Sequence, residues 1–311
     1  MKNRRPLRVA LTALALALPV LAVATVPGPT SAAPPAPAAA AKATTVRIMT
    51  FNIQYGGEEK EGENLGKIAG VINHYKPSVV LLNEVDRNLP DCKGGECNQA
   101  VYLAKLVGMK ASYFPIEHKE GKHWRGNAIL IRKNYDFVGK VGKTRLQPRE
   151  GVSCYERGVI GAKIGIGSKR IVVGSTHLDF REPRQKCPYN GAAPTTLDVP
   201  YEQARFLRKN VIRRPSCATF LAGDMNRVPG SKTYNVLTSR LNDVWKTKAA
   251  QGNGYTNGFE SGGKKKRIDY IFFKHARAVY ADVPGTEPDD DFPSDHKPVM
   301  ATFKVSAGQS C

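Results

Sequence analysis

The segment T-F-L-A-G-D-M-N-R-V-P, residues 219–229, decides the fold class of this chain. Its apolar half, residues 219–222, predicts a short buried strand. Gly223 then allows the backbone to turn, so that Asp224 and Asn226 project together from the end of the strand. An acid and an amide two residues apart can equally form a simple turn, because both side chains bond readily to their own backbone. The segment alone therefore leaves both a turn and a functional site open.

Other apolar runs are predicted to end in the same way, on a side chain that carries an oxygen or an imidazole. Four of them place such a group at Asn52 in T-F-N-I, Glu84 in L-L-N-E-V, His177 in G-S-T-H-L and Asp269 in R-I-D-Y-I-F-F. A fifth, S-D-H-K-P-V-M, opens a strand with Asp295 and His296. This recurrence favours a functional site over a set of unrelated turns.

Hydrophobic periodicity from Thr45 onward predicts alternating strands and helices. The predicted strands cover residues 46–53, 79–82, 127–132, 159–166, 170–176, 219–222, 268–273, 278–283 and 298–305. The predicted helices cover residues 65–72, ended by Pro77, residues 99–107, and residues 201–211 after a cap at Asp198. The order of these elements predicts an α/β fold with a core of two sheets and helices outside.

The first 44 residues differ in composition from the rest. Of the 311 residues, residues 45–306 are expected to form one domain. Residues 1–32 are expected to be a signal peptide, because Lys2, Arg4, Arg5 and Arg8 precede an apolar stretch and the small residues T-S-A. A membrane anchor is the alternative, and Arg4 and Arg5 leave a twin-arginine address open. Residues 33–44, rich in Pro and Ala, predict an extended linker. We therefore expect a secreted protein without stable membrane insertion once the signal is cleaved.

An even number of cysteines in an exported chain predicts disulfides. The six cysteines are Cys92, Cys97, Cys154, Cys187, Cys217 and Cys311. Sequence leaves their pairing open, although the short Gly-containing loop between Cys92 and Cys97 favours that pair. No two C-x-x-C pairs are present, so the cysteines do not indicate a zinc site.

The chain is strongly basic. Its formal net charge is +20, and the four cations of the signal region, where there are no acids, would leave +16 after cleavage. A charge of this size favours polyanions or anionic surfaces as partners. Basic composition can also serve solubility alone, so charge by itself does not decide the partner.

Seven strings together resemble one protein family. They are T-F-N-I-Q, L-L-N-E-V-D-R, R-G-N-A-I-L-I, S-T-H-L-D, A-G-D-M-N, R-I-D-Y-I-F and S-D-H-K-P-V, in this order from Phe51 to Val299. The set resembles the endonuclease/exonuclease/phosphatase superfamily, which includes DNase I, exonuclease III and neutral sphingomyelinases. The resemblance implies a DNase I-like four-layer α/β sandwich of two packed, mainly antiparallel sheets flanked by helices. It also implies cleavage of phosphoester bonds with a divalent metal.

The chemistry of the residues agrees with that implication. Hydrolysis of a phosphodiester needs a cation at the phosphate oxygens, an activated water and a proton donor for the leaving oxygen. Glu84 is the expected primary ligand of a hard cation, with Asn52 and Asp295 adding oxygens. Few protein ligands completed by waters suit Mg²⁺, with Mn²⁺ as an alternative.

Five further residues receive catalytic roles. His296 is the expected general base, held in one tautomer by Asp269. His177 would protonate the leaving group or stabilise charge on the phosphate, and Asp224 and Asn226 would orient the water and bind a phosphate oxygen. The family's carboxylate partner for the histidine at position 177 is not evident in the sequence, and only Glu117 and Glu120 are candidates for it.

Basic residues around the predicted strands are candidates for binding phosphates. The expected substrate-binding residues are Arg157, Arg87, Lys264, Lys265, Lys266 and Arg267. All of them can also be ordinary solvated charges. The acidic run at residues 289–291 leaves open a structural Ca²⁺ site or a plain acidic turn.

The sequence therefore predicts an exported, metal-dependent phosphodiesterase, a monomer whose substrate is nucleic acid cut with low sequence specificity. One alternative is a lipid phosphodiesterase similar to sphingomyelinase or phospholipase C, although no long apolar hairpin for membrane insertion is seen. The other is a module of the same fold that binds polyanions without catalysis. The intact set of acids and two histidines disfavours that second alternative.

Overall fold

The structure is a computed structural model that describes residues 43–57, 64–88, 98–118, 124–148, 151–187, 190–259, 263–285, 292–306 and 311. The chain divides into two units, Met1–Ala40 and Ala41–Cys311, and every described residue belongs to the second unit. The expected signal peptide, nearly all of the linker, the Cys92–Cys97 pair, Glu120 and the acidic run at 289–291 lie outside the described residues.

The first sheet has six strands in the order β11-β12-β1-β2-β4-β3. Their bounds are Thr44–Asn52 (β1), Val79–Arg87 (β2), Met109–His118 (β3), Trp124–Arg132 (β4), Arg277–Asp282 (β11) and Val299–Val305 (β12). β1 and β2 pair in parallel, whereas the other neighbours pair antiparallel. The first sheet is thus mainly antiparallel, with one parallel pair at its centre.

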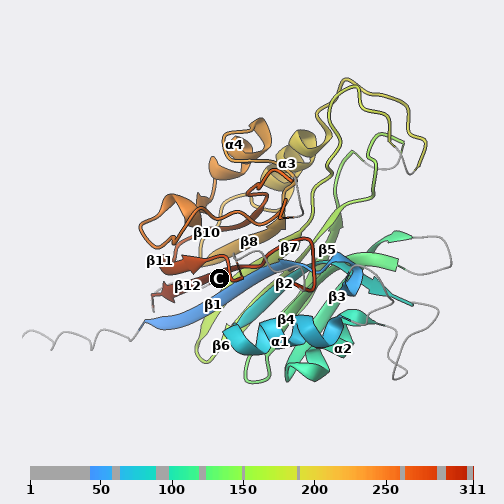
Figure 1. Cartoon of the computed structure of the whole chain (residues 1–311). Helices are drawn as coiled ribbons and strands as arrows, with labels where there is room; N and C mark the ends of the chain where they lie inside the picture. The colour runs from blue at the N-terminus through green and yellow to red at the C-terminus, as the bar shows by residue number, and fades with distance from the viewer. Residues whose placement is uncertain are drawn as a thin grey trace, which may run out of the picture. The chain divides into compact units, whose positions relative to one another are not determined.

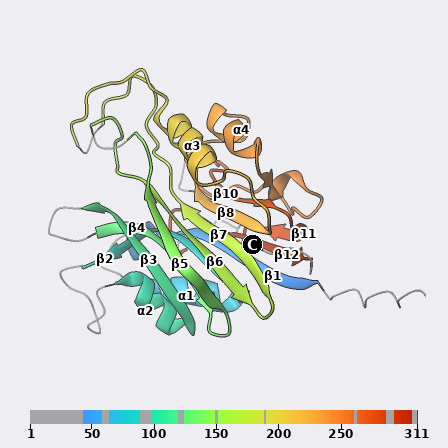
Figure 2. The ribbon, with the colours of Figure 1, turned by 180° about the vertical axis from the view of Figure 1, so that it is seen from behind.

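The second sheet also has six strands, in the order β5-β6-β7-β8-β10-β9. Their bounds are Asp136–Arg145 (β5), Gly158–Ile166 (β6), Lys169–Thr176 (β7), Thr219–Asp224 (β8), Asn242–Asp243 (β9) and Asp269–Lys274 (β10). Again one central pair, β7 and β8, is parallel and the rest are antiparallel. Figure 2 shows the antiparallel strands β5, β6 and β7 side by side.

In the part of the chain that the structure describes, four helices cover the outer faces of the sheets. Their bounds are Leu65–Tyr75 (α1), Gln99–Leu106 (α2), Val199–Asn210 (α3) and Lys232–Thr238 (α4), and two short 3₁₀ turns lie at Gln54–Gly56 (η1) and Val244–Lys246 (η4). Side chains of Asn98, Asp198 and Ser231 accept backbone N–H groups at the starts of α2, α3 and α4, as expected of N-caps. α1 and α2 pack on the first sheet, and α3 and α4 pack on the second (Figure 1).

In the sequence, the central strands are nearly continuous apolar runs because both of their faces are buried. Side chains on one face of β1, such as Val46 and Ile48, meet those of β6 and β10, such as Ile160 and Ile271, between the sheets. The alternate residues of β1, such as Phe51, pack instead under α1 and α2. The predicted four-layer, DNase I-like α/β sandwich is confirmed.

All predicted strands and helices are present, with bounds that differ by a few residues. β3, β5, β9 and α4 were not predicted, and one placement was wrong. Asp269 opens β10 instead of ending a strand. Because β10 runs antiparallel to β8, its first residue lies opposite Asp224, so the side chain still reaches the predicted edge.

Two disulfides join described residues, Cys154 to Cys187 and Cys217 to Cys311. The described part of the chain contains no free cysteine. The second disulfide ties the last residue of the chain to the segment just before β8. Among the described residues, no helix combines the length and the apolar character that a membrane crossing needs.

Candidate active site

The strand directions bring the predicted residues to one edge of the two packed sheets. β1 and β2 are parallel and carry Asn52 and Glu84 near their carboxyl ends. β7 and β8 are parallel in the second sheet, so His177, directly after β7, lies close to Asp224 at the end of β8. No side chain fits at Gly223, because a Cβ there would lie 1.8 Å from the Thr176 carbonyl oxygen. This close approach of the two strands keeps the histidine and the aspartate together.

The segment before β12 closes the same edge. The Ser294 hydroxyl donates to the Asn52 carbonyl oxygen at 2.7 Å and accepts the His296 N–H at 3.1 Å. The Asp295 N–H donates to Gln54 Oε1 at 2.8 Å. These bonds hold Asp295 and His296 beside the ends of β1 and β2.

Glu84 projects from an irregularity in its strand. The pairing of β2 with β4 shifts register between Leu82 and Val85, and Glu84 has a φ of 54°, which is unfavourable for a side chain of its kind. Its carboxylate accepts a hydrogen bond from Asn52 Nδ2 at 3.1 Å. Burial alone would raise the pKa of Glu84, but His177, Arg125 and the Asn52 amide outweigh burial and lower it. The strained backbone therefore presents an ionised carboxylate at the edge.

Asp224 lies at the centre of the cluster, with its side chain 2% exposed. Its Oδ2 is 3.3 Å from Asn52 Nδ2, 3.3 Å from His177 Nε2 and 3.7 Å from His296 Nε2. Its Oδ1 accepts the Asn226 N–H at 2.8 Å. Burial would raise the pKa of Asp224, but the two imidazoles and the Asn226 N–H hold it below its usual range. One carboxylate oxygen thus faces both histidines.

His296 and Asp269 form a buried pair. His296 Nδ1 lies 2.7 Å from Asp269 Oδ2, and both side chains are less than a tenth exposed. Burial lowers the pKa of His296, but Asp269 and Asp224 raise it well above the usual value. The pair fixes Nδ1 as the protonated nitrogen, so Nε2 faces Asp224 and the site.

His177 is held by an arginine where a carboxylate was expected. Arg157 Nη1 lies 3.1 Å from His177 Nδ1. A guanidinium can only donate, so Nδ1 accepts and the proton of the neutral ring is assigned to Nε2, facing Asp224. The nearest carboxylate oxygen to Nδ1, Glu84 Oε1, is 3.9 Å away. Glu117 lines the adjoining cleft.

Asn226 completes the surroundings of this ring. Its Nδ2 lies 3.0 Å from His177 Nε2 and donates to the Leu178 carbonyl oxygen at 3.0 Å. Its φ of 50° lies in the left-handed region, which Asn tolerates better than most residues. The sharp turn after β8 therefore aims Asn226 back across the site at the end of β7.

Arg157 has capacity left for a ligand. It is 9% exposed, and its Nε has no partner among the described residues. A small cleft there is lined by Glu84, Arg125 and His177 as well as Arg157. A buried guanidinium N–H without a partner is costly, and an anionic oxygen would satisfy it.

Two sets of residues could hold a metal ion. One is Asp224, Asp269 and His296, and the other is Glu84 with Asp295. One ligand atom each from Asp224, Asp269 and His296 lies within 4.8 Å of the others. However, the short Asp269–His296 bond already occupies two of these groups. Asp295 is exposed at the rim, yet the surrounding protein and the nearby acids, Glu84 among them, raise its pKa to about 6. Carboxylates that destabilise one another in this way suit a hard cation between them.

The Asn52 amide points its nitrogen toward the two carboxylates of the site. Its Oδ1 accepts the Gln54 N–H at 3.1 Å, and its Nδ2 points to Glu84 and Asp224. In this arrangement Asn52 orients the two carboxylates.

Asn83 was missed in the sequence, although a polar residue after V-V-L-L was a usable signal. It is fully buried, and its Nδ2 donates to Asn127 Oδ1, Ser175 Oγ and the Thr176 carbonyl oxygen at 2.9, 3.3 and 3.0 Å. Its Oδ1 accepts the Asp224 N–H at 3.1 Å. Asn83 therefore joins β2 of one sheet to β7 and β8 of the other, directly behind the site.

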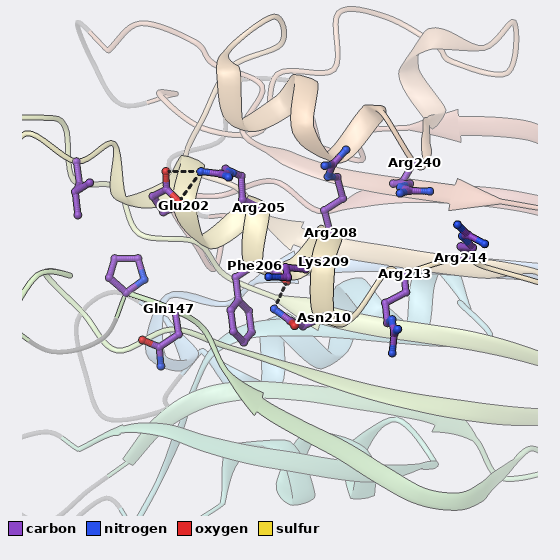
Figure 3. Close-up of a pocket in the computed structure, with 12 residues that line it drawn as sticks. Gln147, Glu202, Arg205, Phe206, Arg208, Lys209, Asn210, Arg213, Arg214 and Arg240 are labelled. Atoms are coloured by element: carbon purple, nitrogen blue, oxygen red, sulfur yellow. Dashed lines mark hydrogen bonds and ion pairs between the residues drawn. The ribbon is translucent and has the colours of Figure 1, made fainter.

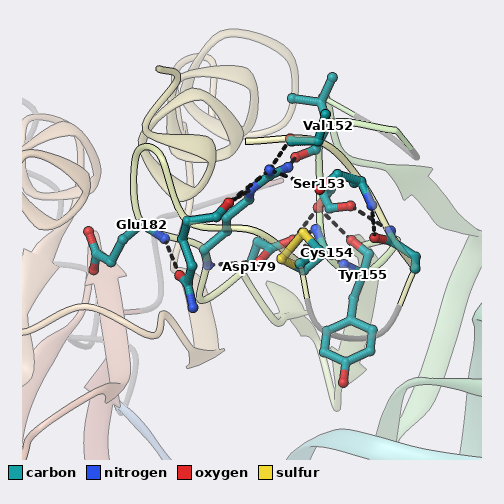
Figure 4. Close-up of a disulfide and its surroundings, with 12 residues drawn as sticks. Val152, Ser153, Cys154, Tyr155, Asp179 and Glu182 are labelled. Atoms are coloured by element: carbon teal, nitrogen blue, oxygen red, sulfur yellow. Dashed lines mark hydrogen bonds between the residues drawn. A yellow bond between two sulfur atoms is a disulfide. The ribbon is translucent and has the colours of Figure 1, made fainter. Parts of the chain in front are cut away.

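Asp179 was also missed. It is fully buried, and its Oδ2 accepts from the Ser153 hydroxyl and from the N–H groups of Cys154 and Tyr155 (Figure 4). The Cys154–Cys187 disulfide links the same two segments. Because Asp179 is two residues from His177, and Tyr155 two residues from Arg157, these bonds position the Arg157–His177 contact.

Tyr55 and Arg125 form a third unpredicted feature at the rim. The Tyr55 ring is 3.4 Å from Arg125 Cζ, and its hydroxyl bonds to Glu84. Arg125 in turn donates to both carboxylate oxygens of Asp86, at 3.0 and 3.3 Å. Residues 54–57 all have positive φ, so an unusual backbone holds the tyrosine there.

The predicted phosphate-binding residues divide into three groups. Arg157 lies in the site. Arg87 and the lysines at 264, 265 and 266 are exposed, and the backbone of Lys266 pairs with Asn257, which also pairs with His296. Arg267 does not belong with them: it is buried and forms a 2.8 Å ion pair with Asp243, so we withdraw its predicted role in substrate binding.

This fold and this arrangement of acids and histidines define a class of phosphoester-cleaving proteins. The chain belongs to the endonuclease/exonuclease/phosphatase family, whose model matches residues 49–296. Members of the family are usually phosphoesterases or nucleases and typically use a divalent metal.

Several solved structures share the fold. A family member from Beutenbergia cavernae is 23% identical, with a TM-score of 0.63 and coverage of 85% of this chain and 72% of that chain. One from Bacteroides vulgatus is 20% identical, with a TM-score of 0.66 and coverage of 85% and 100%. The human Nocturnin catalytic domain with bound sulfate is 20% identical, with a TM-score of 0.60 and coverage of 83% and 93%. A search among curated proteins returned no match.

Proposed function

We propose that the protein is an exported, metal-dependent phosphodiesterase that hydrolyses DNA or RNA with little sequence preference. The observation that carries the proposal is the position of Asp224 Oδ2, 3.3 Å from one imidazole and 3.7 Å from the other. A site with two histidines on one carboxylate, next to an arginine N–H without a partner, suits proton transfer around an anion.

His296 serves as the general base in this proposal. Its Nε2 takes a proton from the attacking water, while Asp269 at 2.7 Å stabilises the imidazolium that results. The base must be neutral before it accepts the proton. The activity should therefore rise with pH as His296 loses its proton.

His177 and Arg157 act on the phosphate side. Arg157 fixes the proton of the neutral His177 ring on Nε2, from which the ring can donate a hydrogen bond that stabilises negative charge on the phosphate. In this proposal the Arg157 Nε–H, which has no partner among the described residues, binds a phosphate oxygen as negative charge develops, and Asn226 assists it. Asp224 keeps both rings oriented.

The donor set fits a divalent cation. Glu84 and Asp295 would hold Mg²⁺, with waters completing its shell, and Asn52 would keep Glu84 in position. When bound, the cation neutralises charge on the phosphate and lowers the barrier to attack.

Charge supports a polymeric anion as the substrate. The exposed Lys264, Lys265 and Lys266 lie on the segment that leads to Asp269, and their loop pairs with the strand segment of His296 through Asn257. Such lysines attract a nucleic acid backbone without reading bases. Export is supported by the sequence of residues 1–32 and by the two disulfides, which persist in oxidising compartments.

A panel of substrates tests the proposal. Purified protein is assayed on plasmid DNA, single-stranded DNA, RNA, sphingomyelin and a small chromogenic phosphodiester, each with Mg²⁺ and with EDTA. We expect cleavage of nucleic acid that EDTA abolishes. Hydrolysis of sphingomyelin alone would overturn the assignment of nucleic acid, and no hydrolysis of any substrate would favour a binding module.

A further inference from the structure

We propose a second anion-binding site, a groove beside α3 that holds the phosphate backbone of a single-stranded segment of nucleic acid. The groove has a volume of about 1260 Å³ and lies over the second sheet (Figure 3). Six cations line it: Arg205, Arg208, Lys209, Arg213, Arg214 and Arg240. Among the described residues that line it, Glu202 is the one acid.

These cations are exposed and largely uncompensated. Within the described part of the chain, only Arg205 among them forms an ion pair, with Glu202 at 3.2 Å. Arg208 makes a long hydrogen bond to the Ser239 hydroxyl at 3.4 Å. Like charges gathered in one groove repel each other and destabilise the free protein. An anionic ligand would relieve that repulsion.

The cations are arranged in a row. Arg205, Arg208 and Lys209 follow helical spacing of three and four residues, so they share one face of α3. The rise of about 1.5 Å per residue spreads these three charges over about 6 Å, and Arg213 and Arg214 extend the row past the end of the helix. A row of charges suits a chain of phosphates better than a single small anion.

Two apolar side chains in the lining favour a single strand over a duplex. Phe206 is half-buried and Leu197 is 43% exposed, and both lie in the same groove as the arginines. Unpaired bases expose faces that stack on aromatic rings, whereas the bases of a duplex are covered. The combination of basic and apolar lining is that of a groove for single-stranded nucleic acid.

One backbone hydrogen bond links a wall of the groove to the candidate active site. The Leu146 N–H donates to the Arg157 carbonyl oxygen at 2.8 Å, and the next two residues, Gln147 and Pro148, line the groove. In the proposal, a strand with one phosphate at Arg157 runs past residue 147 onto α3. The path of a substrate from Arg157 to the groove rests on the proposed function, whereas binding of a single strand in the groove does not rest on it.

The test compares two triple variants that lose the same charge. The first replaces Arg208, Arg213 and Arg214 by Ser. The second is a matched control that replaces three exposed lysines outside the groove by Ser: Lys133, Lys248 and Lys304. Binding of a labelled 30-nucleotide oligothymidine is measured in EDTA over a salt series, after thermal melts have shown that both variants are folded.

We expect the groove variant to bind at least tenfold more weakly than wild type at low salt. The slope of log K against log salt should fall by about 2, because each phosphate contact contributes about 0.7 for a single strand. The control should match wild type. Equal affinities and equal slopes for the two variants would overturn the proposal.

A parallel cleavage assay with Mg²⁺ keeps the two proposals separate. If wild type binds the oligonucleotide through the groove but cleaves no nucleic acid, the nuclease assignment fails and the groove stands. If wild type cleaves nucleic acid and both variants bind equally, the groove fails and the nuclease assignment stands.

Discussion

Replacement of Asn83 by Ala should cost both stability and activity, because this buried amide connects the two sheets behind the site. It would remove the acceptor of the Asp224 N–H, at 3.1 Å, and the donor to the Thr176 carbonyl oxygen, at 3.0 Å. Both backbone groups belong to buried residues that water cannot reach. Asn127 Oδ1 also loses its donor, although Asn127 Nδ2 still donates to the Gly158 carbonyl oxygen and the Ser175 hydroxyl still donates to that of Leu82.

The expected cost follows from these two groups. A buried polar group left without a partner costs about 1–3 kcal/mol, so two of them cost about 2–6 kcal/mol. That is a large part of the total stability of about 5–15 kcal/mol that is typical of a domain. The activity of the folded fraction should also fall, since the Asp224 backbone is no longer fixed next to the histidines.

Urea denaturation and initial rates measure the two effects. The control is Asn235→Ala on the exposed side of α4, where only a bond to the Gly230 carbonyl oxygen is lost and the change should stay within about 0.5 kcal/mol. A loss of less than about 1 kcal/mol for Asn83→Ala, on the same scale, would refute the argument. Unchanged rates in the folded variant would refute the link between Asn83 and the site.

Three further predictions concern the base, the basic loop and the cysteines. Asp269→Asn should lower the pKa of His296, because burial lowers that pKa and Asp269 is the largest group that opposes the effect of burial. The rise of the rate with pH should then begin at lower pH, and the plateau rate should fall by about 10²–10⁴-fold. A pH–rate profile whose rising limb does not move would contradict the pairing of Asp269 with His296. Replacement of the lysines at 264–266 by Ser should raise KM for long nucleic acid and flatten its salt dependence, whereas identical KM and slope would mean a merely solvated loop. Mass spectrometry without reduction should find no free thiol in the secreted protein, and two or more free thiols would contradict that expectation. Loss of the Cys154–Cys187 bridge, whose cysteines are 33 residues apart, should lower the free energy of unfolding in urea by about 4 kcal/mol.

The central strands were predictable because both of their faces are buried, which leaves long apolar runs in the sequence. The three missed strands, β3, β5 and β9, are at sheet edges, and β9 has only two residues. β5 has no buried residue, and β3 carries Lys110, Ser112 and Pro115, so neither shows a clear apolar period. α4 has only seven residues, too few for a periodic pattern to stand out.

The site residues were predictable as chemical groups at strand ends, since this is a local feature of the sequence. Their partners were not, because they depend on which strands become neighbours. Arg157 reaches His177 only because β6 pairs with β7, and Asn83 reaches Asp224 only across two sheets. Arg267 was misjudged for the same reason, since its neighbours in sequence are exposed lysines but its partner, Asp243, comes from another segment.

The most direct test of the account is the initial rate of cleavage of a single-stranded oligonucleotide in Mg²⁺ by three proteins. These are wild type, Glu84→Gln, which keeps the shape of the side chain but removes its charge, and His296→Ala, which removes the base. We expect wild-type activity that EDTA abolishes and losses of about 10²-fold or more in each variant, with circular dichroism showing an unchanged fold. Wild-type activity that persists in EDTA, or full activity in either variant, would contradict the assignment of this edge of the two sheets as a metal-dependent active site.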